Sequence, residues 1–178
     1  MIRPLGPAEQ DAILTIINEA AQVYRGVIPE ELWHEPYMTL HDLQAELRMG
    51  VRFFGYEAQG RLVAVMGRQE VKGVTLIRHA YVLPAWQRQG LGGKLLRHLL
   101  LGVTQPVLVG TWAKAHWAVR FYEKHGFIQE PPAERDRLLR TYWSIPDRQI
   151  DASVVLSYSR ESGSQRFPAS RSFSCASL

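Results

Sequence analysis

Three glycines within four positions, Gly90, Gly92 and Gly93, stand between a strand-like run and a leucine-rich helical pattern. The run before them, VTLIRHAYVLP, is apolar on both parities, which is typical of a strand covered on both faces. A strand that passes through bare backbone into a helix leaves several N–H groups at the helix start without internal partners. An anion can approach such groups closely, and the helix dipole favours it. The stretch WQRQGLGGK therefore predicts a phosphate-binding loop.

Two well-known phosphate loops do not fit this stretch. The Walker pattern requires a glycine where Arg88 stands and a serine or threonine where Leu95 stands. The dinucleotide pattern GxGxxG requires a third glycine at Leu95 and a preceding parallel-sheet unit. Neither nucleotide-binding fold is predicted.

Apolar periodicity and turn residues predict the remaining elements. The first helix has its apolar face at helical spacing, and the second begins with a Thr-x-x-Asp capping pattern at Thr39. Residues 130–149 read as a charged loop with one or two helical turns. The expected fold class is α/β, with a central, mostly antiparallel sheet flanked by helices. In chain order the expected elements are a strand at 2–5, helices from 7 and 39, strands at 51–58, 61–71 and 74–84, a helix from 91, a strand at 106–113, a helix at 115–126, and strands from 127 and at 150–158.

Length and composition predict one globular domain over residues 1–160. The chain has 178 residues, of which 46% are hydrophobic and 21% charged. Residues 161–178 contain six serines and no periodicity, so they are predicted to be a disordered C-terminal extension. No apolar run approaches the roughly 20 residues that a membrane-spanning helix needs, and the only cysteine is Cys175. We therefore expect a soluble cytoplasmic protein with no membrane partner.

The charge balance permits an anionic ligand without indicating nucleic acid. The formal net charge is +4 and the isoelectric point is about 9.4. The basic residues are scattered along the chain rather than gathered in one run, and no set of exposed aromatic residues on one strand accompanies them. A nucleic-acid partner is not expected.

Two segments together resemble the motifs of the GNAT superfamily of acyl-coenzyme A dependent N-acyltransferases. The first is VLPAWQRQGLGGKLL, residues 82–96, which contains the Gln-x-x-Gly-x-Gly pyrophosphate signature. The second is AVRFYEKHGF, residues 118–127, at about the expected distance. The order of predicted elements fits as well. The resemblance covers residues 1 to about 158.

The resemblance implies acetyl-coenzyme A as co-substrate and no metal. The amides of the glycine loop would hold the pyrophosphate, and the end of the preceding strand would pair with the pantetheine arm. Arg88 and Lys94 could add positive charge. The implied cofactor-binding residues are Ala80, Tyr81, Val82, Gln87, Arg88, Gln89, Gly90, Leu91, Gly92, Gly93 and Lys94.

By the same resemblance, an acceptor amine attacks the thioester directly and no covalent intermediate forms. Tyr122 stands where many members place the tyrosine that gives the departing thiolate its proton. A core aromatic beside Phe121 and Phe127 is the alternative reading of Tyr122. The amine must also lose a proton, because a lysine-like ammonium has a reference pKa of about 10.4.

The base that takes this proton is not set by the motifs. Members with a strand glutamate carry it on the face of Val82, where this sequence is expected to place Leu76 and Arg78. His79, on the opposite face with Tyr81, is a candidate because histidine titrates near neutral pH. A structural histidine is the alternative. Further candidates are Glu57, Glu70, His34 and a water chain.

The leading hypothesis is an N-acetyltransferase acting on a primary amine of a small molecule or peptide. The alternative is a non-catalytic domain that binds or senses acyl-coenzyme A. Family members often have an asparagine where this chain has Ala115, which leaves open whether Lys114 or His116 replaces its contact. The aromatic loop at 24–38 would help form the acceptor cleft or plug the core edge, and residues 130–149 would cover that cleft or form a dimer surface. A homodimer is plausible by analogy alone.

Overall fold

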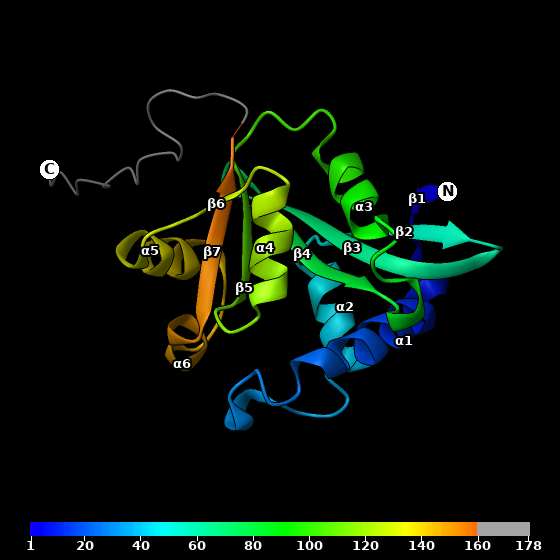
Figure 1. Cartoon of the computed structure of the whole chain (residues 1–178), viewed down its shortest axis with the longest axis horizontal. Coiled ribbons are helices and arrows are strands. Elements are labelled where there is room, and N and C mark those ends of the chain that lie inside the picture. Colours follow the sequence, from blue (N-terminus) through cyan, green and yellow to red (C-terminus); the bar gives the residue numbers. More distant parts are fainter. Residues whose placement is uncertain (160–178) are drawn as a thin grey trace, which may run out of the picture.

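The computed structural model describes residues 1–159, and seven of their strands form one mixed sheet (Figure 1). The strand order is β1-β2-β3-β4-β5-β7-β6, and every neighbouring pair is antiparallel except β4 and β5. The predicted α/β fold with a mostly antiparallel sheet is confirmed. The strands are β1 (Ile2–Pro4), β2 (Arg52–Ala58), β3 (Arg61–Val71), β4 (Val74–Val82), β5 (Val107–Trp112), β6 (Ile128–Gln129) and β7 (Ser153–Tyr158).

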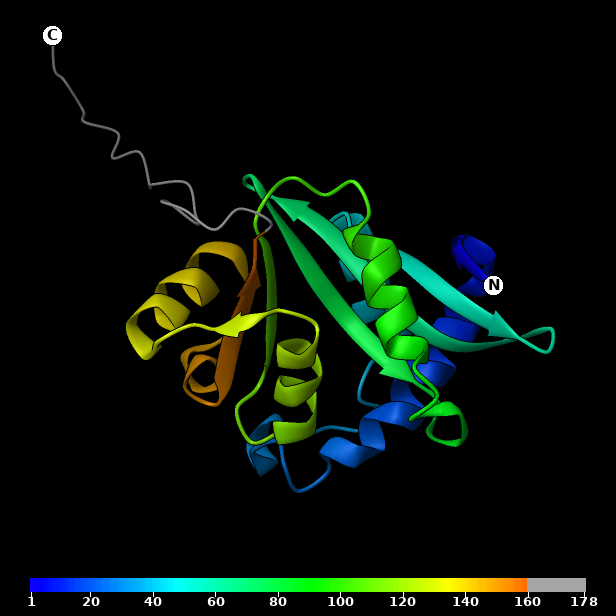
Figure 2. The same ribbon diagram turned by 45° about the horizontal axis from the view of Figure 1, so that its top comes forward.

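Helices cover both faces of the sheet. On one face, α3 (Leu91–Leu100) and α4 (His116–Lys124) lie side by side, as Figure 2 shows. On the other face, α1 (Gln10–Ala21) and α2 (Leu40–Arg48) cover the β2–β4 half, and α5 (Pro132–Tyr142) and α6 (Asp147–Asp151) cover the β5–β7 half. We call these the α3/α4 face and the α1/α2 face.

The apolar spacings in the sequence become the buried faces of these helices. Ile13, Ile16 and Ile17 of α1 are at most 2% exposed, and Leu95 and Leu96 of α3 are fully buried. Burying one such side chain contributes about 1.5–3 kcal/mol. The helices are thus held to the sheet mainly by their apolar stripes.

The β4–β5 pair is short and then splits. These parallel strands pair only through Thr75–Ile77 and Val107–Val109. Beyond them, β5 remains paired with β7 as far as Trp112, while β4 continues to Val82 paired only with β3. The strands diverge toward their C-terminal ends, before the helices α3 and α4 begin (Figure 1).

A β-bulge in β4 changes which side chains share a face. Arg78 lies opposite Gly67 and Tyr81 lies opposite Val65, so one extra residue is inserted in β4. His79 is in the left-handed region with φ 50°. As a result Arg78 and His79 both point to the α1/α2 face.

The bulge corrects one expectation about β4. Leu76 packs with the α5 cluster and Arg78 contacts α2, whereas Val82 packs against the α3/α4 cluster. Simple alternation predicted that Leu76 and Arg78 share the face of Val82, and this was wrong because the inserted residue reverses the parity. His79 and Tyr81 do lie on the face opposite Val82, as expected.

The segment 130–149 is more ordered than a charged loop. Its first part forms the 11-residue helix α5, which buries Leu138, Leu139 and Tyr142 against the sheet. Its last part forms α6, so β7 begins at Ser153 rather than at residue 150. The sequence did not predict this helix because α5 is mostly charged and contains too few apolar residues to show a clear helical period.

The predicted extension at 161–178 lies outside the described residues. Within residues 1–159, no helix combines the length and apolarity that crossing a membrane requires.

The N-terminus of α2 tests a local prediction from sequence. The Thr39 hydroxyl accepts the Asp42 amide at 3.1 Å, and the Asp42 carboxylate accepts the Thr39 amide at 3.0 Å, which completes the predicted capping box. We expect Thr39→Ala to lower the free energy of unfolding by about 1 kcal/mol. Thr39→Ser keeps the cap and should lose less than half of this. Equal losses for both variants in thermal or urea unfolding would contradict the capping account.

Candidate active site

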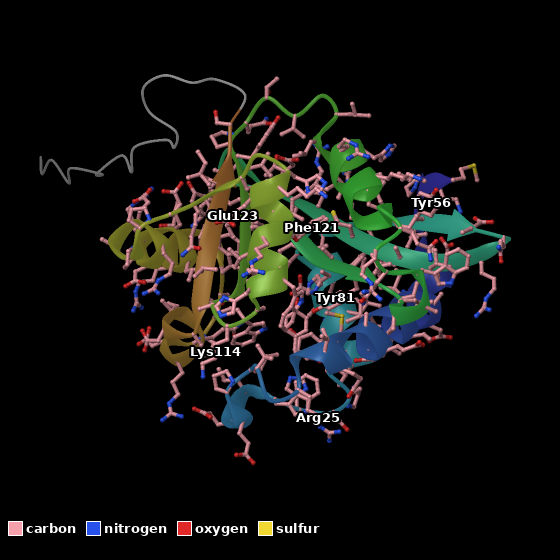
Figure 3. All side chains as sticks on the ribbon, in the orientation of Figure 1. Arg25, Tyr56, Tyr81, Lys114, Phe121 and Glu123 are labelled. Atoms are coloured by element: carbon pink, nitrogen blue, oxygen red, sulfur yellow. The ribbon has the colours of Figure 1, made fainter. Side chains whose placement is uncertain are left out.

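Two different structural features favour glycine at the three glycine positions of the loop. Gly90 is the residue before α3 and has φ 77°, a left-handed conformation that glycine adopts without strain. A Cβ on Gly92 would lie 3.4 Å from the ring of Phe121, and one on Gly93 would lie 2.6 Å from His125 Nε2. Gly92 and Gly93 therefore let α4 lie against the first turn of α3, where Figure 3 shows Phe121 between the two helices.

A run of six amides at this loop has no acceptor within residues 1–159. It extends from Arg88 to Gly93. Two residues of the predicted cofactor-binding set have backbone amides that are already bonded. The Gln87 amide donates to the Pro84 carbonyl, and the Lys94 amide donates to the Gly90 carbonyl. The run of free amides at the start of a ten-residue helix fits a pyrophosphate.

The side chains of Lys94 and Gln87 are also engaged. Lys94 Nζ lies 5.7 Å from the centre of the Tyr56 ring, on β2. The Gln87 side chain donates to the Val82 carbonyl at 3.0 Å and so braces the loop against the strand end. Arg88, with φ 60°, has no ion-pair partner among the described residues.

The edge of β4 beside the split carries unpaired backbone groups. The Leu83 amide donates to Val63 on β3, so by alternation Tyr81 also turns its backbone groups to β3. Ala80 and Val82 then turn theirs toward the split, where β5 no longer pairs. Of these groups, the Val82 carbonyl already accepts the Gln87 side chain. An extended arm can add to this edge by main-chain hydrogen bonds. The predicted roles of Ala80, Tyr81 and Val82 remain predictions.

Tyr122 lies beneath the split on the α3/α4 face. It is 4% exposed, and its ring meets Phe121 and Phe127 edge to face at 5.0 and 5.4 Å. Burial, and secondly the nearby Tyr24, raise the pKa of its hydroxyl well above the usual value. The phenol therefore keeps its proton across the physiological pH range, as a proton donor must.

Aromatic rings close the split from the opposite face. Tyr24, just after α1, stacks on Tyr37 at 6.5 Å and meets Tyr81 at 6.4 Å and Trp117 at 5.4 Å. Burial, and then the neighbouring Tyr37, raise the pKa of Tyr24 to about 12. Part of the 24–38 loop thus plugs the core edge. Figure 3 shows Tyr81 in this region, between β4 and the end of α1.

A cavity of about 860 Å³ lies on the α1/α2 face beside this aromatic plug. Its size is typical of small-molecule sites. The 24–38 loop, α2, β4 and the segment after α5 contribute to its wall. The lining residues used below are His34, Tyr37, Glu46, Glu70, Arg78 and His79. The loop at 24–38 and residues 143–149 both contribute lining residues, so the two segments border the same cavity.

Glu46 brings a carboxylate to the two bulge residues. Its Oε1 lies 2.8 Å from Arg78 Nη2, and its Oε2 lies 3.0 Å from His79 Nε2. Burial opposes ionisation of Glu46, but His79 and Arg78 outweigh it and lower the pKa of the carboxyl below its usual value. Arg78 also donates to Gln69 at 2.9 Å. The result is a neutralised charge cluster at the cavity wall.

The other predicted base candidates have different surroundings. Glu57 pairs with Arg3 at 3.1 Å, away from the cavity wall. Glu70 lines the cavity but is held by Arg68 and Thr75. His34 lines it too, with Nδ1 2.9 Å from the Pro36 carbonyl oxygen.

Glu46 was missed by the sequence analysis. It belongs to no motif, but a signal was present, because it lies three positions after Leu43 on the flank of the buried stripe of α2. A carboxylate that is partly buried at such a position needs a hydrogen-bond or ion-pair partner in the folded protein.

The structure combines a split mixed sheet with a run of free amides at a helix start and an open strand edge beside it. Residues 50–129 match the family model described as an acetyltransferase (GNAT) domain. This match assigns residues 50–129 to the GNAT acetyltransferase domain family, and the fold agrees with the assignment.

Solved structures share this fold at low sequence identity. One is the PaiA N-acetyltransferase from Thermoplasma acidophilum, in complex with coenzyme A, with a TM-score of 0.67 and 16% identity over 89% of this chain and 98% of that one. Another is the ribosomal-protein-S18-alanine N-acetyltransferase from Escherichia coli, with a TM-score of 0.63 and 18% identity over 94% of this chain and 99% of that one. No curated protein sequence matches the chain significantly.

The glycine loop generates a binding prediction with a matched control. Gly90→Ala forces a side chain into the left-handed region, which costs roughly 1–2 kcal/mol, and the amides can relax out of line to relieve it. We expect coenzyme A to bind about tenfold more weakly. Gly102→Ala carries the same strain at φ 71° just after α3, away from the loop.

Calorimetric titration of both variants provides the measurement. Gly102→Ala should lose stability and keep the wild-type affinity. The same loss of affinity in both variants would refute a specific role for the loop.

Proposed function

We propose that this chain is an N-acetyltransferase that transfers the acetyl group of acetyl-coenzyme A to a primary amine of a small molecule or peptide. The observation that carries the proposal is the run of free amides from Arg88 to Gly93 next to the unpaired edge of β4. The family membership supports an acyl thioester as donor. The coenzyme A in the Thermoplasma structure supports the ligand that this loop would take.

In this proposal the chain mainly binds and orients its two substrates. The amides from Arg88 to Gly93 hold the pyrophosphate, and the open edge of β4 at Ala80 and Val82 holds the extended arm. The acceptor amine enters from the α1/α2 face, where the 860 Å³ cavity lies. Donor and acceptor then meet at the split, and this placement lowers the barrier for direct attack.

Two side chains handle the protons. His79 lines the cavity and accepts the proton that the attacking amine loses. Tyr122, on the other side of the sheet, donates its hydroxyl proton to the departing sulfur. Burial keeps Tyr122 protonated until that step. The carboxylate of a strand glutamate is not needed, since the bulge already presents an imidazole to the cavity.

Ligand-dependent unfolding tests the binding half of the proposal. Acetyl-coenzyme A, coenzyme A, ATP and NADPH are each added to the full chain. At about 100 times its dissociation constant, a specific ligand adds roughly 2.7 kcal/mol. Both coenzyme A forms should raise the midpoint while ATP and NADPH do not. Release of the coenzyme A thiol in the presence of a panel of amines then tests acetyl transfer. Binding of coenzyme A without thiol release for any amine would indicate a non-catalytic domain.

Tyr122→Phe tests the proton donor. We expect kcat to fall about 10²-fold with coenzyme A affinity unchanged, because only the hydroxyl is removed. Tyr158→Phe is the matched control, since its ring also packs on Phe127, at 5.3 Å. If both variants keep wild-type turnover in the thiol-release assay, Tyr122 is only a core aromatic.

His79→Ala tests the base. We expect kcat to fall about 10²-fold, with partial recovery when imidazole is added to the assay. The removed ring leaves space between Phe53 and Glu46 that imidazole can enter. Unchanged turnover at neutral pH would assign proton removal to water instead.

A further inference from the structure

The imidazole of His79 is held from two sides. The Phe53 ring stacks on it with a centroid distance of 5.7 Å and an angle of 25°. Glu46 Oε2 lies 3.0 Å from Nε2 at the ring edge. The Glu46 and His79 side chains are only 14% and 16% exposed, so solvent has little access to this contact.

Glu46 is itself anchored. Its other oxygen meets Arg78 at 2.8 Å, Arg78 donates to Gln69, and Gln69 donates to the Met49 carbonyl at 2.8 Å. The chain of contacts runs from β4 through β3 to the end of α2. Arg78 is therefore occupied, and the second carboxylate oxygen is left for His79.

Two atoms of this contact have no other partner. Glu46 Oε2 and His79 Nε2 are buried, and neither makes an aligned hydrogen bond within residues 1–159. Their 3.0 Å separation is that of an ion pair, although the contact does not have the geometry of a hydrogen bond. A small rotation of either side chain would align them, and burial makes the unpaired arrangement costly.

The contact determines which ring nitrogen is free. An ionised carboxylate can only accept, so Nε2 carries the proton that faces Glu46. The lone pair then lies on Nδ1, and His79 lines the acceptor cavity. When Nδ1 takes a proton from the attacking amine, an N–H bond of the amine breaks, its electron pair stays on nitrogen, and the Glu46 charge stabilises the imidazolium.

We propose that Glu46 is a positioning residue, which fixes the tautomer and orientation of His79 so that Nδ1 faces the acceptor amine. The inference rests on the proposed role of His79 as base. It accounts for a buried carboxylate that meets the bulge residues from another element. Neutralising Arg78 alone would not require Oε2 to lie against His79.

The substitution Glu46→Gln makes a specific prediction. Arg78 is a pure donor and will hold the amide oxygen, which turns the amide NH₂ toward His79 Nε2. Nε2 must then accept, the proton moves to Nδ1, and the base loses its lone pair on the cavity side. We expect kcat to fall about 10²-fold, with the KM for acetyl-coenzyme A within twofold of wild type.

The control is Glu134→Gln, the same substitution on a carboxylate of α5 that pairs with Arg137 and does not line the cavity. It should keep wild-type kcat. A pH profile of kcat/KM accompanies both variants. Its acidic limb should move in Glu46→Gln only. The other titratable or charged groups that face this cavity are Glu31, His34, Tyr37, Glu70, Lys72, Arg78 and Tyr142.

Nitrogen NMR of imidazole-labelled protein reads the tautomer without any need for activity. We expect the Nε2–H form of His79 in the wild type and the Nδ1–H form in Glu46→Gln. An unchanged tautomer together with wild-type kcat in Glu46→Gln would overturn the inference. If Glu46→Gln does not fold, the wild-type spectrum decides: an Nδ1–H form there overturns it, and rescue of kcat in Glu46→Asp supports it.

The two levels of the proposal fail in different ways. A wild-type protein that acetylates no amine but shows the expected tautomer switch would remove the proposed function and leave the Glu46 contact intact. An active wild-type protein whose tautomer and kcat ignore Glu46 would remove the positioning role alone.

Discussion

The short pairing between β4 and β5 is the constraint on which the rest of the structure depends. Only Thr75–Ile77 and Val107–Val109 pair, after which the strands diverge. A parallel pair that stops early leaves main-chain groups of β4 without a strand partner, and such groups must be satisfied by water or a ligand. The two faces of the sheet are close at the split, where Tyr24 contributes, after burial, to the raised pKa of Tyr122.

The helices that border the split are packed against each other and against the sheet. The α3 helix is fixed by buried leucines, and the bare turn of Gly92 and Gly93 lets α4 lie directly against it. The free amides of Arg88 to Gly90 lie in the exposed loop before α3, whereas those of Leu91 to Gly93 belong to its packed first turn. The orientation of these helical amides is set before any ligand arrives, which reduces the entropy cost of binding.

The bulge at His79 determines which side chains of β4 face the cavity on the α1/α2 face. By inserting one residue, β4 turns Arg78 and His79 to the same face, where α2 supplies Glu46. One charge of each sign is buried there together with an imidazole, and the arrangement is tolerable because every charged group has an opposite partner. Bulges of this kind re-aim side chains beside functional sites.

The sequence alone determined the element order, the buried helix stripes, the capping box at Thr39 and the position of the glycine loop, because each depends on local spacing or local backbone chemistry. It could not determine which side chains of β4 share a face of the sheet. A one-residue bulge has no periodic signal in the sequence, and it moves every side chain after it to the opposite face. It could not place Glu46 beside His79, because that contact joins residues far apart in the chain. It also left open which amides are free, as that depends on acceptors at Pro84 and Gly90. These features are decided by long-range packing, and therefore only the tertiary structure decided them.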